Sequence, residues 1–260
     1  MFFNELINPY LNFKIKKNIT IMKNNQSFSI MASAIAILFC AIGCNAPTKE
    51  AEAKQEAPKA VEAVVPVAFV PFKVMSVTHT VKDFDVWKKN YDEHESMRVA
   101  SGLTKLAVCR DMDSPNKVYV FVKAADIQKA KDFAANKDLK EAMQKGGVVG
   151  IPTFLYVDIV RFEESPTEHK GRVRIEHKVK DYDIWLKAYD AEGKETRTKN
   201  GLIDRAVSRD ISDPNMVYVT FAISDLAKAK ARINDPALKK LMTDAGVIGA
   251  PVINFYTSVD

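Results

Sequence analysis

The sequence feature that most constrains the fold is a segment that occurs twice. It runs from Val81 to Gly102 and recurs from Val179 to Gly201, and both copies begin with the pattern Val-Lys-Asp-aromatic-Asp-aliphatic-Trp. A strand pattern precedes each copy, and two strands, a second helix and a last strand follow it. Self-similarity of this kind indicates a repeat architecture. We therefore interpret most of the chain as two tandem units.

Identical residue pairs keep the two units in register. His79 and His177 are 98 positions apart, whereas Arg110 and Arg209 are 99 positions apart. One residue is therefore inserted in the second unit, within its first helix or at the end of that helix. A duplication explains this similarity without any functional requirement, so repetition alone identifies no site.

The predicted helices carry local signals at their ends. Asp83 and Asp181 stand at N-cap positions, where a carboxylate accepts hydrogen bonds from free backbone N–H groups. Glycines at positions 102 and 201 suit the residue after a helix end, so we expect one continuous helix up to each glycine. Asp126 and Asp225 cap the second helices in the same way. These second helices are interrupted near positions 136 and 235.

The strands follow from apolar runs and from the turns between them. A proline flanked by Asp or Ser and Asn presets a reverse turn, so strands two and three of each unit form a hairpin. The predicted strands of the first unit are 74–81, 105–110, 117–122 and 153–160, and those of the second unit include 203–209, 216–222 and 252–259.

Each unit thus has the order β-α-β-β-α-β, which is the ferredoxin-like arrangement and belongs to the α+β class. Helices on one face of an antiparallel sheet leave its other face bare. We expect the two sheets to cover each other within one chain, as an intrachain pseudo-two-fold α+β barrel with an enclosed space. The predicted boundaries are 72–160 for repeat 1, 161–172 for a linker and 173–260 for repeat 2.

The first 44 residues have the pattern of a targeting signal, with Met22 as the expected true start. An apolar run at 30–43 is shorter than the roughly 20 residues that cross a bilayer. The sequence Ala41-Ile42-Gly43-Cys44 resembles the lipobox of bacterial lipoproteins, which implies cleavage before Cys44 and lipid on its sulfur. An ordinary signal peptide or an uncleaved anchor is the alternative. Residues 45–71 are rich in Ala, Glu, Lys and Pro and predict a flexible tether.

This interpretation predicts a location in the bacterial cell envelope, with the protein lipid-anchored to a membrane and facing the periplasm or the cell exterior. Cys109 is the one cysteine left after removal of the signal and lipidation of Cys44, so no intramolecular disulfide is expected. Residues 1–44 hold four of the 38 basic and one of the 33 acidic residues, which leaves 34 against 32 and a net charge of +2. We therefore expect no nucleic-acid partner.

Three repeated motifs carry a resemblance to a known superfamily. They are His-x-Val-x-Asp-[Phe/Tyr]-Asp-x-Trp, Arg-Asp-x-x-[Ser/Asp]-Pro-Asn and Gly-Val-[Val/Ile]-Gly-x-Pro. Over 75–160 and 173–260 the chain resembles the dimeric α+β barrel superfamily, in particular its antibiotic-biosynthesis-monooxygenase-like and cyclase-like members. This superfold hosts oxygenases, isomerases, haem enzymes and proteins of unknown role. Haem-degrading relatives place His and Trp around the second helix, and neither occurs in 126–146 or 225–246, so we expect no cofactor.

Two residue pairs are candidates for catalysis. His79 and His177 titrate near neutral pH and can act as base, donor or ligand. A histidine satisfied by a local hydrogen bond is the alternative, and no spacing indicates a metal site. Arg110 and Arg209 at a barrel mouth can bind a carboxylate or enolate oxygen through two hydrogen bonds. An Arg-Asp pair that pins the hairpin is the alternative for them.

A second set of residues, all in the first helices, is a candidate for ligand binding. The aromatic residues fall four apart on one helix face, and packing against the sheet is the alternative to a binding role. The set consists of Trp87, Tyr91, Arg98, Trp185, Tyr189 and Arg197.

The function predicted from these patterns is a lipid-anchored α+β-barrel protein that binds a small, partly apolar molecule in the enclosed space. Two alternatives stay open. One is a cofactor-independent monooxygenase or isomerase of an aromatic or enolisable substrate, with His as base and Arg stabilising the developing charge. The other is a protein-interaction platform.

Overall fold

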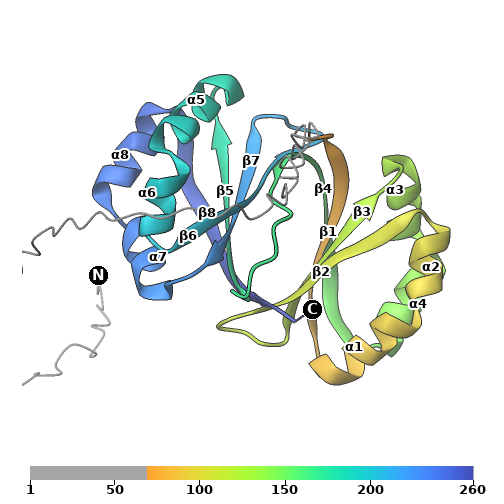
Figure 1. Ribbon diagram of the computed structural model, residues 1–260. Helices are drawn as coiled ribbons and strands as arrows, with labels where there is room; N and C mark the ends of the chain where they lie inside the picture. Colours follow the sequence, from red (N-terminus) through yellow and green to blue (C-terminus); the bar gives the residue numbers. More distant parts are fainter. Residues whose placement is uncertain (1–68, 260) are drawn as a thin grey trace, which may run out of the picture. The chain divides into compact units, whose positions relative to one another are not determined.

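Eight antiparallel strands, four from each repeat, close into one barrel in the computed structural model, which describes residues 69–259 (Figure 1). The predicted signal region, the predicted lipidation site Cys44 and the predicted tether up to position 68 lie outside the described residues. The predicted fold class is confirmed: each repeat is a ferredoxin-like unit, and the two sheets together make an intrachain α+β barrel.

Repeat 1 contributes four strands and four helical segments. They are β1 (Phe72–Val81), α1 (Phe84–Glu93), α2 (Glu95–Ala100), β2 (Leu103–Asp111), β3 (Lys117–Ala124), α3 (Ile127–Ala135), α4 (Lys137–Lys145) and β4 (Val148–Phe162). Repeat 2 follows the same order. Its elements are β5 (Gly171–Val179), α5 (Tyr182–Glu192), α6 (Lys194–Lys199), β6 (Leu202–Asp210), β7 (Met216–Ile223), α7 (Leu226–Ile233), α8 (Pro236–Asp244) and β8 (Val247–Ser258).

The barrel closes at two junctions between the repeats. The strand order is β1-β3-β2-β8-β5-β7-β6-β4. At one junction Cys109–Asp111 of β2 pair with Tyr256–Ser258 of β8, and at the other Val157–Phe162 of β4 pair with Ala206–Asp210 of β6. Closure leaves no open sheet edge, so every strand has a hydrogen-bonded neighbour on both sides.

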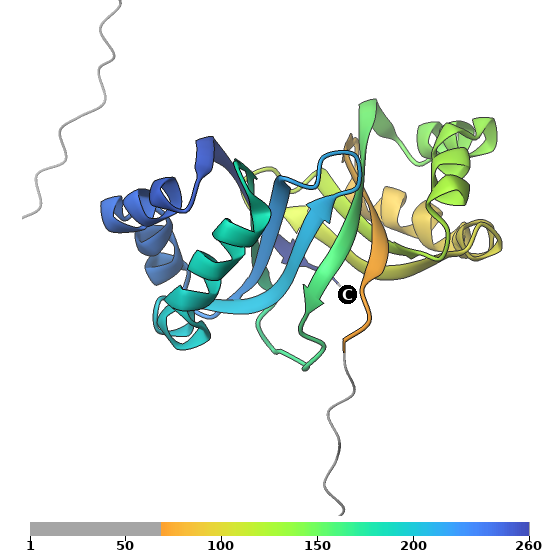
Figure 2. The ribbon, with the colours of Figure 1, turned by 90° about the horizontal axis from the view of Figure 1, so that it is seen from above.

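The helices of the two repeats lie on opposite outer sides of the barrel (Figure 2). Because side chains alternate along a strand, each sheet presents one face to its own helices and one to the barrel interior. On β1, Met75 and Val77 belong to the core that the helices cover and His79 lines the cavity beside it, whereas Val74 belongs to an interior cluster. Each repeat thus has its own helix-covered core, and the interior is a third compartment.

The predicted caps are confirmed. Asp83 accepts a hydrogen bond from the backbone N–H of Val86 at 2.9 Å, and Asp181 accepts one from Ile184 at 2.9 Å. Gly102 has φ +72°, which is a conformation that L side chains rarely adopt and which suits the residue after a helix end.

Two predictions about element boundaries were wrong. The first helix of each repeat is not continuous, because it breaks at His94 in repeat 1 and at Gly193 in repeat 2. The residue inserted in repeat 2 lies before this break, since α5 is one residue longer than α1, and Gly193 at the break has φ +81°. The last strands begin earlier than expected: β4 starts at Val148 and β8 at Val247, and each continues through a register shift at its Gly-x-Pro segment.

Candidate functional site

A large cavity lies in repeat 2, between the sheet and α5–α8. Its volume is about 560 Å³. The polar residues that line it include His177 on β5, Trp185 and Glu192 on α5, and Arg197 on α6. Aliphatic and aromatic side chains make up most of the remaining wall, so a ligand here would meet a mainly apolar surface with few polar groups.

Two buried polar atoms at this cavity have no hydrogen-bond partner. They are Nε2 of His177 and Nε1 of Trp185, and the centres of the two rings are 5.4 Å apart. An unpartnered buried polar group costs free energy, so such groups in a folded protein call for an explanation. A ligand oxygen between the two rings would supply one, because it can accept from the indole N–H and donate to a neutral imidazole nitrogen.

Burial decides the charge of His177. It lowers the pKa of this imidazole to about 4, because the charged form loses its hydration in an apolar environment. His177 is therefore neutral at pH 7, with one ring nitrogen that donates and one that accepts. A neutral histidine can accept a proton from a ligand, and a ligand anion formed in this way would stabilise the imidazolium.

The position of Trp185 follows from local sequence. The Asp181 cap fixes the start of α5, and Trp185 and Tyr189 fall four residues apart on the face that meets the sheet. Their rings stack with centroids 5.3 Å apart. His177 on β5 faces the same layer, so His177, Trp185 and Tyr189 form one continuous line of rings along the cavity.

Arg197 is held by carboxylates rather than left free for a ligand. It donates two hydrogen bonds of 2.7 Å to Asp204 and one of 2.7 Å to the carbonyl of Tyr189, and it lies 3.5 Å from Glu192. Its guanidinium also lies over the ring of Tyr189. These contacts compensate the buried charge of Arg197, so a ligand in the cavity would meet little net positive charge here.

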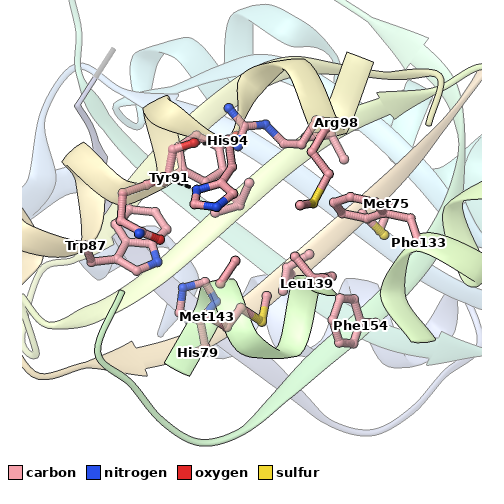
Figure 3. Close-up of a pocket in the computed structure, with 16 residues that line it drawn as sticks. Met75, His79, Trp87, Tyr91, His94, Arg98, Phe133, Leu139, Met143 and Phe154 are labelled. Carbon is pink, nitrogen blue, oxygen red and sulfur yellow. Dashed lines mark hydrogen bonds between the residues drawn. The ribbon is translucent and has the colours of Figure 1, made fainter. Parts of the chain in front are cut away.

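Repeat 1 has a cavity at the equivalent place, but its volume is about 60 Å³ (Figure 3). His79 lies 5.2 Å from Trp87 between ring centres, and neither of its nitrogens has a hydrogen-bond partner. Burial lowers the pKa of His79 to about 4 as well. The line of aromatic rings is thus present in both repeats, and the space beside it differs.

Side chains that fill the space in repeat 1 have smaller or differently directed counterparts in repeat 2. Phe133 and Phe154 line the repeat 1 cavity (Figure 3). At the matching positions, Ile253 is smaller and Arg232 turns away to pair with Glu192 at 2.7 Å. A guanidinium is costly to bury in apolar space without a partner, so the Arg232 side chain does not enter the cavity. The space that Phe133 fills in repeat 1 therefore stays empty in repeat 2.

The acidic partners of the buried arginine also differ between repeats. Arg98 donates a 2.5 Å hydrogen bond to the carbonyl of Tyr91 and lies over the Tyr91 ring. Lys105 occupies the position that corresponds to Asp204, and His94 the position that corresponds to Glu192. Among the described residues, Arg98 therefore forms no ion pair like that of Arg197.

The structure places Arg110 and Arg209 away from these cavities. Arg110 donates to the carbonyl of Pro115 at 2.8 Å and lies over the ring of Phe84, and Arg209 does the same with Pro214 at 2.6 Å and Tyr182. Both arginines hold the hairpin turn, although through a proline carbonyl rather than through the expected aspartate. Neither belongs to the walls of the cavities described here.

The two histidines do not meet inside the barrel. Each lines the cavity beside the helices of its own repeat, so the two histidines form no joint site. A space between the two sheets does exist, with a volume of about 280 Å³.

Several residues of functional interest were not singled out from the sequence. Glu192 and Asp204, which bind Arg197, have no acidic counterpart in repeat 1, and Arg172, Arg174 and Arg205 line the barrel interior. The signal that could have identified them is a difference between aligned repeat positions rather than an identity. Within residues 69–259, no group of three or more His, Cys, Asp or Glu could hold a metal ion. No helix in the same range is both long and apolar enough to span a bilayer.

Similarity to known proteins is confined to structure. No protein-family model and no curated protein matches the chain. A Fusobacterium nucleatum protein assigned as a candidate monooxygenase is 13% identical, with a TM-score of 0.51 over 74% of this chain and 93% of that one. An anthrone oxidase-like protein is 14% identical, with a TM-score of 0.49 over 73% and 92% of the two chains.

A Listeria monocytogenes ferredoxin-fold protein related to antibiotic biosynthesis monooxygenases is 9% identical, with a TM-score of 0.44 over 74% of this chain and 97% of that one. The likeness to the Fusobacterium nucleatum protein shows a shared fold and no more. Identities this low say nothing about substrate or reaction.

Proposed function

We propose that the protein binds a small, mainly apolar molecule in the cavity of repeat 2, with an oxygen of that molecule placed between His177 and Trp185. The observation that carries this proposal is the pair of unpartnered buried atoms, His177 Nε2 and Trp185 Nε1, beside a space of about 560 Å³. A space of this size is typical of sites for small organic ligands.

The chemistry of the walls defines the class of ligand. Most of the lining is aliphatic or aromatic, and the buried charges of Arg197 and Glu192 already pair with each other and with Asp204 and Arg232. Lys239 also lines the cavity and is exposed to solvent. A strongly charged ligand would lose its hydration against the apolar walls. A neutral ring system that carries a hydroxyl or an enolisable carbonyl fits this environment.

The test is a binding titration with 2-naphthol as probe. We expect 1:1 binding to the wild-type protein. Replacement His177→Leu or Trp185→Phe removes one hydrogen bond to the ligand and should weaken binding by about tenfold, because a hydrogen bond of this kind contributes roughly 1 kcal/mol or more. Neither replacement leaves a protein group unpartnered, so both variants should fold.

The matched control is His79→Leu, which makes the same change in the repeat with the small cavity. It should leave the affinity for 2-naphthol unchanged. Equal weakening by His79→Leu and His177→Leu, or no binding to the wild-type protein, would contradict the proposed site.

A second candidate function is proton abstraction from the bound molecule, and the neutral His177 at the cavity favours it. His177 would take a proton from an acidic C–H, and the indole N–H of Trp185 would donate to the developing enolate oxygen. An isomerase would return this proton to another carbon. A cofactor-independent monooxygenase would instead let the carbanion react with O₂, and the same proton would complete a hydroperoxide.

This second candidate is tested with benzoylacetone in D₂O. Exchange of its central C–H, followed by NMR, should be faster with the wild-type protein and with His79→Leu than without protein. It should fall to the rate without protein in His177→Leu. Exchange that is unchanged in His177→Leu would remove this residue from the reaction.

We also propose that a lipid on Cys44 anchors the protein in the bacterial envelope, facing the periplasm or the cell exterior. The support is the sequence Ala41-Ile42-Gly43-Cys44 after an apolar run. Mass spectrometry of protein from a bacterial membrane fraction should find a mature N-terminus at Cys44 with attached lipid. A Cys44→Ser variant should leave the membrane fraction without losing the fold of residues 69–259.

A further inference from the structure

The barrel interior has two unlike walls. The wall from repeat 1 is mainly apolar and includes Val74, Leu106, Phe121, Val157 and Ile159. The wall from repeat 2 is polar and cationic and includes Arg172, Arg174, Arg205, Thr220, Tyr256 and Ser258. The cavity between them has a volume of about 280 Å³, separate from the two cavities beside the histidines.

This contrast arises at matching positions of the two repeats. Arg172 corresponds to Val74, and Arg205 corresponds to Leu106. The two repeats have the same order of helices and strands, so repeats with identical sequences would give two identical walls. The side chains break this symmetry where the walls face the cavity, and the result is an amphipathic space.

The arginines of the polar wall are only partly compensated. Arg172 donates to the backbone carbonyls of His169 and Gly171, and Arg205 donates to the carbonyl of Ser165 at 2.6 Å. Burial, and then the nearby charge of Arg205, lower the pKa of Arg172. Two guanidinium groups therefore repel each other at one side of the cavity, and an anion between them would relieve this repulsion.

Arg174 lies deeper in the same wall. It lies 3.2 Å from Glu176, which is the one carboxylate that forms an ion pair with any of the three arginines among the described residues. Its NH1 donates to Ser76 across the cavity at 3.4 Å, and its buried Nε has no partner. Glu163 contributes a negative charge near Arg205, but its carboxylate accepts hydrogen bonds from Ser165.

We propose that the barrel cavity binds an organic monocarboxylate with an apolar body. The carboxylate lies against Arg172 and Arg205, which are half-buried and reach the cavity from β5 and β6. Arginine suits this role because its planar donors match the two oxygens of a carboxylate. The apolar body lies along the wall from repeat 1. This site is distinct from the one proposed beside His177.

The test uses octanoate as probe and octan-1-ol as its neutral counterpart in calorimetric titrations. We expect octanoate to bind at least tenfold more tightly than octan-1-ol. Arg172→Gln and Arg205→Gln should each weaken octanoate binding by about tenfold and should leave octan-1-ol binding unchanged, because a hydrogen bond to a charged group contributes roughly 1.5–3 kcal/mol. His177→Leu is the control and should not change octanoate binding.

Three results would overturn the proposal: no octanoate binding to the wild-type protein, equal affinity for octanoate and octan-1-ol, or loss of octanoate binding in His177→Leu. A measurement on the wild-type protein alone covers the case in which an arginine variant fails to fold. Octanoate should shift the amide NMR signals of Thr220 and Tyr256 in the barrel and leave that of Ile233 beside the other cavity in place. The reverse pattern would also refute the site.

Discussion

The two cavities between helices and sheet share one frame and differ about ninefold in volume, with about 60 Å³ in repeat 1 and about 560 Å³ in repeat 2. In both, a neutral buried histidine lies beside a tryptophan that stacks on a tyrosine. The line of aromatic rings is therefore part of the architecture of both repeats. This agrees with the alternative given from the sequence, in which these residues pack the helix against the sheet. The open space beside it is the feature that distinguishes repeat 2.

A few substitutions at the edge of a core therefore decide whether side chains fill it or a cavity remains. Phe133 fills space in repeat 1, whereas its counterpart Arg232 turns toward Glu192. The loss of a large apolar side chain leaves a void that the surrounding structure closes only in part. An arginine that pairs with a carboxylate of the wall can thus leave a pocket open without lining it itself.

The largest expected effect tests the packed cavity. Phe133→Ala should lower the free energy of unfolding by about 3–5 kcal/mol, because it removes a buried aromatic side chain from a filled core. Ile253→Ala, beside the existing space in repeat 2, should cost no more than about 2 kcal/mol, the low end for truncation of a large aliphatic residue. Urea denaturation of both variants measures the difference, and equal costs would mean that the two cores are equally packed.

The second largest effect on stability should come from removing a charged residue that pairs with Arg197 beside the repeat 2 cavity. Asp204→Ala leaves the buried Arg197 without its two-bond partner and should destabilise the fold by about 2–3 kcal/mol, somewhat below the usual range since Asp204 is partly exposed. Lys105→Ala, at the matching position of repeat 1, is the control and should change stability by less than about 0.5 kcal/mol. A cost for Asp204→Ala as small as that of the control would show that Arg197 is solvated.

The histidines should make stability depend on pH to the same extent in both repeats. Burial lowers the pKa of His79 and of His177 to about 4, below the value of about 6.5 for the unfolded chain. The unfolded state thus binds more protons between these values, so stability is full above pH 6.5 and is lost as the pH falls toward 4.

From pH 7 to pH 5, each histidine should account for a loss of about 2 kcal/mol. Chemical denaturation of His79→Leu and His177→Leu at both pH values measures this contribution against the wild-type protein. Each variant should lose less stability than the wild type. If His177→Leu lost as much stability as the wild type between pH 7 and pH 5 while His79→Leu lost less, water would reach His177 and not His79.

The smallest expected effect on stability comes from filling the open cavity. Ile253→Phe gives repeat 2 the residue that repeat 1 carries at position 154, and it should change the free energy of unfolding by less than about 1.5 kcal/mol. The same variant should weaken 2-naphthol binding at least tenfold, measured by titration. Unchanged affinity would place the probe outside this cavity.

Much of the architecture was predictable because its signals are local. The caps at Asp83 and Asp181, the turns around the Pro-Asn pairs and the alternation on β1 each depend on neighbours in sequence. The break in the first helices was missed, although the extra residue in repeat 2 was detected by the change in register. Gly193, at the break in repeat 2, has a positive φ, and a sequence offset alone did not show that the helix ends there.

The site was predictable in part. The pattern on β1 and β5 placed His79 and His177 on the same strand face as neighbouring apolar residues, yet it did not say whether helices or the other sheet cover that face. Arg110 and Arg209 were expected at a barrel mouth, but they bind the turns that follow their own strands. The barrel arginines went unnoticed because the repeats were compared for identities, and these residues differ between them.

Two ferredoxin-like units, their helix starts and the residues that share a strand face can be read from the amino-acid sequence alone, because each follows from periodicity and short-range hydrogen bonding. The tertiary structure decided which face meets which partner, that β2 joins β8 and β4 joins β6, and that one helix-covered core is filled while the other is open. These properties depend on side chains that are far apart in the chain and close in space, such as Glu192 and Arg232. The volume of a cavity and the pairing of its buried charges depend on many such neighbours, so both are set only once the barrel has formed.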